Sequence, residues 1–173
     1  MDKTFYLSDE AVKYQIDTTI TSFKMRDNHG MTEDFYLNEG AWYKIHHSVS
    51  GYGNGIYDES FGVAYSATLN NYFFMFVLRG NEEGSDLEVE WNQKDILRYN
   101  FGSKKNISGI PAKVSFYDTL RVQGVLYHKI IEIDYSKHRD KIDYNTPVKT
   151  YISGEKGLIK FEKRNNVIVE RVE

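Results

Sequence analysis

Five aromatic residues gather around a glycine-rich segment in the first half of the chain, and their side chains are the ones best suited to bind a ligand. They are Trp42, Tyr43, Tyr52, Tyr57 and Tyr72. Flat aromatic faces stack on sugar rings and cover apolar ligands. Half-buried sheets also use many aromatic residues, so a structural role explains these residues as well. We treat the five as candidate ligand-binding residues.

The histidines and glycines of the same region do not form a catalytic or metal-binding motif. His46 and His47 are adjacent in a predicted strand, so their rings point to opposite faces and cannot bind one metal ion together. Residues 51–55 lack the Lys-Ser/Thr pair and the following helix of a phosphate-binding loop, and we interpret them as a hairpin loop. The chain also lacks the Gly-x-Ser-x-Gly turn of serine hydrolases.

The acidic residues do not suit catalysis either. Glu33-Asp34 and Asp58-Glu59 are adjacent pairs, so in strands their carboxylates would point in opposite directions, unlike those of a glycosidase. Residues 81–86 carry oxygen ligands of the kind that Ca²⁺ prefers, but not in the order of an EF-hand, and we interpret them as a solvated turn. We therefore expect no catalytic residues, no bound metal and no cofactor.

Composition and length describe a single domain that spans residues 1–173. A net charge of −3 gives no basic surface for nucleic acid. The absence of cysteine excludes disulfides, thiolate metal sites and cysteine nucleophiles. The sequence has no apolar run of about 18 residues, so it predicts no transmembrane helix, and no signal peptide follows Met1. A cytoplasmic protein fits this pattern, and so does a mature protein whose targeting segment is missing from the sequence.

Apolar residues recur at every second position along most of the chain, which is typical of strands with one buried face and one exposed face. The faces that we expect to be buried lie in residues 14–20, 41–49, 61–69 and 87–91. Alternation of this kind predicts antiparallel sheets.

Residues 72–78 are apolar on both faces and predict a central strand that is covered on both sides. The second layer could be another sheet, the inside of a strongly curved sheet, or a short helix at residues 92–98. Turn-forming residues separate the strands at positions 27–30, 38–40, 51–55, 80–84 and 165–166. We predict an all-β, single antiparallel domain, either a β-sandwich or a strongly curved half-barrel, with about ten strands and at most one short helix.

A two-residue loop at Gln123-Gly124 predicts the pairing of one long hairpin. It would set Val122 against Val125, Leu120 against Tyr127 and Phe116 against Ile131, all on one apolar face. The same pairing places Asp118 opposite Lys129, the one polar intrusion on that face. Opposite charges across a sheet attract each other, so we predict a structural ion pair between these two residues.

The last hairpin favours a three-residue loop at residues 164–166. That loop pairs Phe161 with Val169 and Lys160 with Glu170, whereas a two-residue loop would oppose like charges. Asn166 would then adopt the left-handed backbone conformation, which asparagine tolerates better than most residues.

The two hairpins together resemble a known group of proteins. Residues 114–135, followed by Tyr-Ile-Ser-Gly-Glu-Lys-Gly-Leu-Ile-Lys-Phe at 151–161, resemble the C-terminal half of small envelope lipoproteins of the Bacteroidetes, which are mostly of unknown function. They are also similar to the ends of curved-sheet proteins related to lipoprotein carriers and lipocalins. The resemblance covers roughly residues 110–165 and implies an all-β domain of the periplasm or outer membrane, tethered by a lipidated N-terminal cysteine. This chain has no cysteine, so membrane contact would require an anchor on a segment missing from the sequence.

We therefore expect a non-enzymatic cell-envelope protein that acts by binding or as an assembly part, with a cytoplasmic location as the alternative. One alternative function is a lipocalin-like carrier of a small apolar ligand, which needs an enclosed cavity of roughly 300 Å³ or more. Another is a carbohydrate-binding module that uses coplanar exposed aromatic rings. The partner would be an apolar ligand, a glycan or an envelope protein, and the sequence leaves the oligomeric state open.

Overall fold

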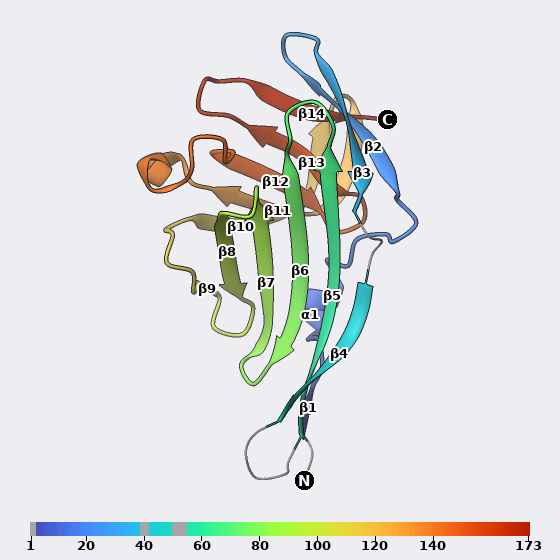
Figure 1. Ribbon diagram of the computed structural model, residues 1–173, viewed down its shortest axis with the longest axis vertical. Helices are drawn as coiled ribbons and strands as arrows, with labels where there is room; N and C mark the ends of the chain where they lie inside the picture. The colour runs from blue at the N-terminus through green and yellow to red at the C-terminus, as the bar shows by residue number, and fades with distance from the viewer. Residues whose placement is uncertain (1–2, 39–41, 50–54) are drawn as a thin grey trace.

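One continuous β-sheet contains most of the chain in the computed structural model, which describes residues 3–38, 42–49 and 55–173 (Figure 1). Its strands are β1 (Lys3–Phe5), β2 (Ser22–Asp27), β3 (Thr32–Leu37), β4 (Trp42–Val49), β5 (Gly55–Ala67), β6 (Phe73–Asn81), β7 (Gly84–Trp91), β8 (Asp95–Asn100), β9 (Lys105–Asn106), β10 (Lys113–Val122), β11 (Val125–Asp134), β12 (Lys149–Ser153), β13 (Gly157–Glu162) and β14 (Ile168–Val172). Two short helices, α1 (Asp9–Val12) and the 3-10 helix η1 (Ser136–Lys141), complete the described elements.

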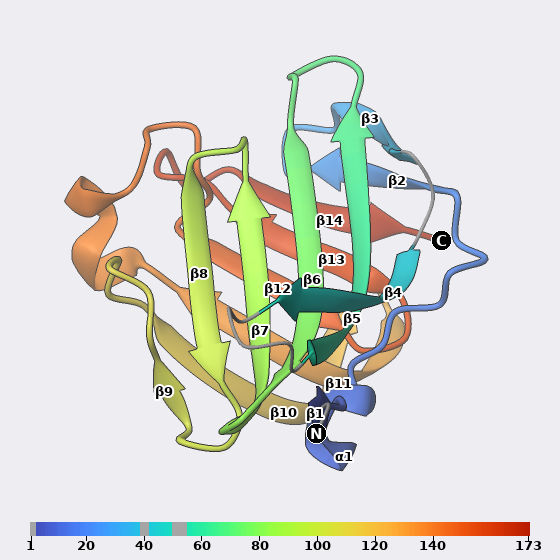
Figure 2. The same ribbon diagram turned by 60° about the horizontal axis from the view of Figure 1, so that its bottom comes forward.

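The strands pair in the order β10-β11-β12-β13-β14-β2-β3-β5-β6-β7-β8-β9, and β1 and β4 also pair with β5. Every described pairing is antiparallel except that of β1 with β5. The sheet curves so strongly that β5–β8 cross β11–β14 steeply on the opposite side of the core (Figures 1 and 2). The prediction of an all-β, strongly curved antiparallel domain is confirmed. The described chain has fourteen strands and two short helices instead of about ten strands and one helix.

Aromatic rings from both halves of the sheet fill the space between them. Trp91 lies with its ring centroid 5.1 Å from that of Phe74 and 5.2 Å from that of Phe161, on the opposite half. Tyr72 closes the cluster at 5.5 Å from Phe161. The Trp91 indole donates a hydrogen bond to Thr150 Oγ1 at 3.0 Å, so its polar atom is satisfied within the core. The far half of the same sheet thus covers the inner face of β6. The predicted cover on both sides is only partial, because Phe73 and Met75 on the outer face are half-buried.

The predicted helix at residues 92–98 is wrong, because this segment turns and returns as strand β8. Asn92 and Gln93 both adopt positive φ values, of 54° and 58°, which form a tight hairpin turn and not a helix. The Lys94 amide donates to the Trp91 carbonyl at 3.1 Å, and the Asn92 side chain accepts from the Phe73 amide at 3.0 Å. Asparagine tolerates the left-handed conformation, and this preference outweighed the short helical pattern.

The predicted strand at residues 14–20 is also wrong. This stretch follows α1 as an irregular segment that covers one end of the core. Tyr14 lies 5.5 Å from Phe116, and Ile16 is 2% exposed, so alternate residues do face inward. The Asp17 amide donates to the Glu155 carbonyl at 3.0 Å, which attaches the segment to the turn after β12. The apolar alternation therefore belongs to an irregular segment that covers one end of the core and pairs with no strand.

The other predicted faces and turns agree where the structure describes them. Residues 61, 63, 65 and 67 of β5 and residues 87, 89 and 91 of β7 are buried, whereas Leu69 lies in a turn and is exposed. Turns occur at residues 27–30, 80–84 and 165–166. The predicted turns at 38–40 and 51–55 fall largely outside the described residues, as does the side-chain face expected for residues 41–49.

The pairing predicted for the β10–β11 hairpin is confirmed, but its single apolar face is wrong. Val122 pairs with Val125 and Phe116 with Ile131. Lys129 has a φ of 53°, which breaks the strand alternation, so Tyr127 and Ile130, three positions apart, enter the same second cluster. Ile131 joins the main core, whereas Ile130 packs with the hairpin tip in a second cluster.

The predicted Asp118–Lys129 ion pair does not form. The residues on either side of Asp118 and Lys129 pair as expected, which leaves these two opposite each other. Because Lys129 is left-handed, its ammonium points elsewhere and lies 3.5 Å from a Glu155 carboxylate oxygen. Lys129 is therefore compensated by the turn after β12 and not by its cross-strand neighbour.

The last hairpin has the predicted three-residue loop. Phe161 pairs with Val169 and Lys160 with Glu170, and the Lys160 ammonium lies 3.5 Å from the Glu170 carboxylate. Asn166 has a φ of 61°, in the left-handed region.

The sheet does not close through backbone hydrogen bonds. Strands β9 and β10 are its two ends, and residues 107–112 connect them. We call the gap between these two strands the seam. On its inner side the Phe116 ring lies 5.3 Å from Tyr99 and 5.9 Å from Phe101, so side chains close the core there.

Candidate ligand-binding site

The structure separates the aromatic residues that the sequence singled out. Tyr72 lies in the core, 8% exposed, and Lys163 covers its ring. Trp42 lies outside the core on β4, over Gly62, where a Cβ atom would overlap with its ring. Tyr57 is half-buried on β5. Tyr52 and the side chain of Tyr43 lie outside the described residues. Trp42 and Tyr72 are thus on different sides of the sheet and do not share a site.

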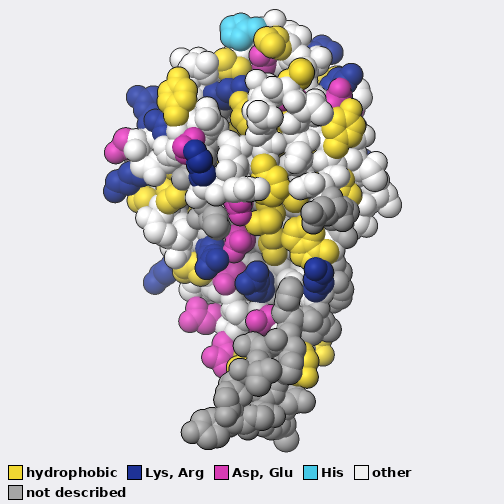
Figure 3. Space-filling view, viewed as in Figure 1, with side chains coloured by type: hydrophobic (Ala, Val, Ile, Leu, Met, Phe, Trp, Pro, Cys, Tyr) yellow, Lys and Arg dark blue, Asp and Glu magenta, His cyan; other side chains and the backbone are white. Residues whose placement is uncertain are grey.

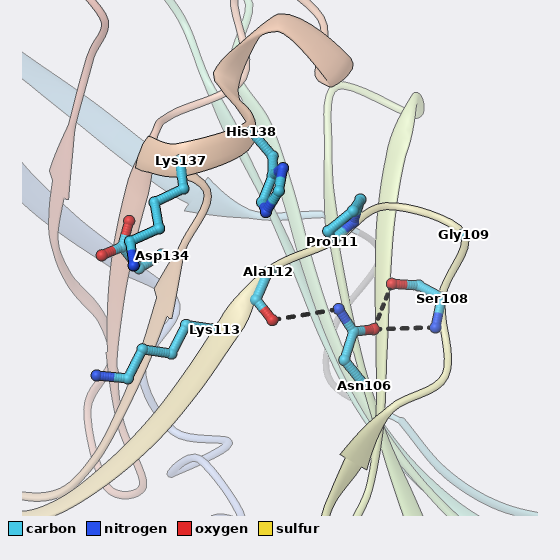
Figure 4. Close-up of a pocket in the computed structure, with 9 residues that line it drawn as sticks. All are labelled: Asn106, Ser108, Gly109, Pro111, Ala112, Lys113, Asp134, Lys137 and His138. Carbon is cyan, nitrogen blue, oxygen red and sulfur yellow. Dashed lines mark hydrogen bonds between the residues drawn. The ribbon is translucent and has the colours of Figure 1, made fainter.

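The largest cleft lies at the seam and has a volume of about 530 Å³ (Figure 4). It is lined by Asn106, Ser108, Gly109, Pro111, Ala112, Lys113, Asp134, Lys137 and His138. Figure 4 shows the residues of the 106–112 connection on one side and Asp134, Lys137 and His138 on the other. A volume of this size is within the usual range for small-molecule sites, roughly 300–1,000 Å³.

One wall of this seam cleft is held in shape by Asn106 at the end of β9. Its side-chain amide donates to the Ile110 carbonyl at 3.0 Å and to the Ala112 carbonyl at 3.4 Å. Its side-chain oxygen accepts from both the amide and the hydroxyl of Ser108. Because one side chain bonds to both halves of the connection, the wall is ordered without regular secondary structure.

The opposite wall carries the charge. Asp134 ends β11, and its carboxylate accepts from the Ser136 amide at 2.7 Å and lies 3.7 Å from the Lys149 ammonium. Burial alone would raise the pKa of this carboxyl, but the Ser136 hydrogen bonds and Lys149 outweigh burial and hold its pKa below the ordinary value. Asp134 is therefore a compensated anion.

Two lysines and one histidine of the cleft have no ionic partner among the described residues. Lys113 begins β10, and Lys137 and His138 lie on η1. The side chains of these three residues form no hydrogen bond or ion pair with any described residue. With Asp134 already paired to Lys149, the cleft presents two ammonium groups and one imidazole without an acceptor. It can therefore accept a negatively charged group.

Sequence reasoning did not find this cleft, because its residues come from three separate segments whose proximity depends on the curvature of the sheet. The only local signals were the Asn106-x-Ser108 turn and the Lys137-His138 pair, and neither is specific. No group of three His, Cys, Asp or Glu residues suited to a metal ion occurs among the residues described. Within the same residues, neither helix is long and apolar enough to cross a membrane.

Comparisons with family models, with curated proteins and with solved structures found no match to this chain. The resemblance to envelope lipoproteins and the envelope location therefore stay predictions. The geometry of the seam cleft is the basis on which a function can be argued.

Proposed function

We propose that this protein is a non-enzymatic binding protein that holds a small anionic ligand with an apolar portion in the seam cleft. The observation that carries the proposal is that two lysines and one histidine of the seam cleft lack an acceptor among the described residues. Lys113, Lys137 and His138 have no acceptor there, while the one lining carboxylate, Asp134, is paired with Lys149.

An anionic group in the cleft would accept hydrogen bonds from these side chains in place of water. Charge-assisted hydrogen bonds from ammonium groups to a carboxylate or phosphate are roughly twice as strong as neutral ones. Pro111 and Ala112 contribute apolar surface opposite, which suits the non-polar part of the same ligand. Both contributions together favour a small organic acid or organic phosphate over an inorganic ion.

The alternative functions receive less support from the geometry. A carrier that encloses its ligand between the two halves of the sheet would need to displace the rings of Tyr72, Trp91 and Phe161. A glycan-binding site needs exposed rings, and the seam cleft has no aromatic residue apart from His138.

The proposal is tested with three probes that each contain one phenyl ring: phenyl phosphate, benzoate and the neutral benzyl alcohol. Binding is measured by calorimetry and by NMR shifts of the His138 ring. We expect the two anions to bind and the alcohol to bind at least about tenfold more weakly. Equal binding of all three probes, or no binding of the anions, would contradict the proposal.

A double variant, Lys113→Ala with Lys137→Ala, should weaken the binding of phenyl phosphate by at least about tenfold. Lys141→Ala is the matched control, because Lys141 is an exposed lysine of the same helix that does not line the cleft. If Lys141→Ala weakens the binding of phenyl phosphate and the double variant does not, the binding site lies outside the seam cleft. The envelope location is tested separately by the first roughly 25 codons of the native gene, where a lipobox is expected.

A further inference from the structure

The outer face of β6 carries an apolar strip that belongs to neither core cluster. Phe74, Phe76 and Leu78 point into the main core and are fully buried. The alternate residues Phe73, Met75 and Val77 therefore point outward. In Figure 3, apolar side chains form a patch in the middle of this face, beside a row of carboxylates.

Strand β5 and Trp42 widen this strip. Met75 pairs with Ala64, and Val77 pairs with Gly62. The Trp42 ring lies over Gly62, where only a glycine leaves room for it. We call the outward surface of Trp42, Ala64, Phe73, Met75 and Val77 the outer strip. Ala64 and Val77 are only 6% and 5% exposed, although they lie outside both core clusters.

An uncompensated carboxylate adjoins the outer strip. Glu90 on β7 pairs with Met75, and its side chain is on the outer face because Val89 and Trp91 are in the core. It is 9% exposed and has no hydrogen-bond or ionic partner within the described chain. Its neighbour Glu88 is already paired with Arg98 at 2.9 Å. Burial and the charge of Glu88 raise the pKa of Glu90.

The outer strip is a surface for a macromolecule and not for a small molecule. Small-molecule sites are concave, whereas the clefts found on the described surface are lined by other residues. A flat apolar patch with a polar margin is typical of a protein–protein interface. An unpaired, desolvated carboxylate at its margin selects a partner with a cation, because an opposite charge would offset the cost of desolvation.

We propose that the outer strip docks a partner protein through a segment that sets a Lys or Arg against Glu90 and apolar side chains against Phe73 and Met75. A second copy of this chain fits poorly. Two copies joined through this face would each bring a desolvated Glu90 carboxylate to the same interface, where like charges repel. This docking surface is separate from the seam cleft and does not depend on the function proposed for it.

The probes are three short synthetic peptides: one alternates valine with lysine, one alternates valine with glutamate, and one alternates serine with lysine. Fluorescence anisotropy measures their binding to the whole protein. We expect the valine–lysine peptide to bind and the other two to bind at least about tenfold more weakly, because docking needs both charge and apolar contact. Equal binding of the glutamate peptide, or no binding of any peptide, overturns the proposal.

Two variants locate the binding on the outer strip. Glu90→Gln keeps the size of the side chain, and Met75→Ser removes apolar surface. Each variant should weaken the binding of the valine–lysine peptide by about tenfold. Glu10→Gln is the control, because Glu10 is an exposed acid on α1, and it should leave the binding unchanged. Circular dichroism shows that each variant is folded. Peptide binding that is unchanged in both variants overturns the proposal, as does a dimer in light scattering that Met75→Ser abolishes, since a second copy would then be the occupant.

Discussion

Lys129 adopts the left-handed backbone conformation in the middle of strand β11, with a φ of 53°. Residues with a Cβ atom disfavour this region, at a cost of about 1–2 kcal/mol, so the surrounding contacts must hold it in place. Those contacts lie on the two faces of the sheet. Ile130 packs into the second cluster on one face and Ile131 into the main core on the other, and both are fully buried. The conformation of Lys129 thus turns Tyr127 to the second cluster, although Ile131, four positions later, faces the main core.

Lys129→Ile should destabilise the protein by about 1–2 kcal/mol, because a β-branched side chain tolerates the left-handed region less well than lysine does. The free energy of unfolding is measured by urea titration followed by circular dichroism. His128→Ile is the matched control on the neighbouring, exposed position, and its effect should stay within about 0.5 kcal/mol. Equal stability of the two variants would show that residue 129 does not have to adopt this conformation.

Single residues also mark the limit of what the sequence predicts. Asn166 was predicted to be left-handed because asparagine tolerates that region, and its φ of 61° agrees. Nothing in a lysine side chain signals the same conformation at Lys129. Its ion pair with Glu155 could not be predicted, because the partner lies on a turn that only the folded sheet brings close.

At the level of elements, residues 7–20 cover one end of the core without forming a strand. Leu7, Ala11 and Ile16 are buried, and Ser8 caps α1 by accepting from the Ala11 amide. Ile16 packs over Gly157, where a Cβ atom would lie 3.3 Å from its side chain. The stability of this end therefore depends on side-chain packing and on few backbone hydrogen bonds.

Ile16→Ala should reduce the free energy of unfolding by about 2–4 kcal/mol, because it leaves a cavity over Gly157. Ile107→Ala is the matched control. Because Ile107 is 52% exposed, this variant should lower the free energy of unfolding by less than about 0.5 kcal/mol. Hydrogen exchange should also accelerate at the Asp17 amide, which bonds to Glu155. A small loss of stability in Ile16→Ala would mean that the segment contributes little to the core.

The elements that the sequence predicted correctly are those whose pattern and partner are both local. Strands β5, β6 and β7 follow one another through short turns. Alternation identified the buried faces of β5 and β7, and a run that is apolar on both faces identified β6 as a central strand. Residues 14–20 share that alternation but have no strand beside them, so the same rule failed there. The seam cleft was not predictable at all, because Asn106, Lys113 and Lys137 meet only when the two ends of the sheet approach each other.

The described chain forms a curved sheet that buries many of its aromatic side chains between its two halves and carries the candidate binding surfaces on its outside. Burial raises the pKa of the Tyr65 hydroxyl to about 12, and that hydroxyl donates to the Ile20 carbonyl at 2.9 Å. Burial is also the main cause of the raised pKa values of Tyr14, Tyr99, Tyr127 and Tyr151. The folded state therefore favours neutral phenols at five positions.

This preference predicts unfolding at alkaline pH. A phenol in the unfolded chain loses its proton near the ordinary pKa of 10.0, whereas Tyr65 in the fold keeps its proton up to about 12. The stabilisation is thus fully present below pH 10 and is lost as the pH rises towards 12, at a cost of about 2 kcal/mol for Tyr65 alone. Absorbance of tyrosinate and circular dichroism, followed together in an alkaline titration, should show the buried phenols ionising only as the sheet unfolds. Full ionisation with an unchanged circular dichroism spectrum would show that water reaches these hydroxyls in the folded protein. Tyr65→Phe should flatten the decline between pH 10 and 12, since it removes the phenol hydroxyl whose pKa burial raises and leaves the ring in the core.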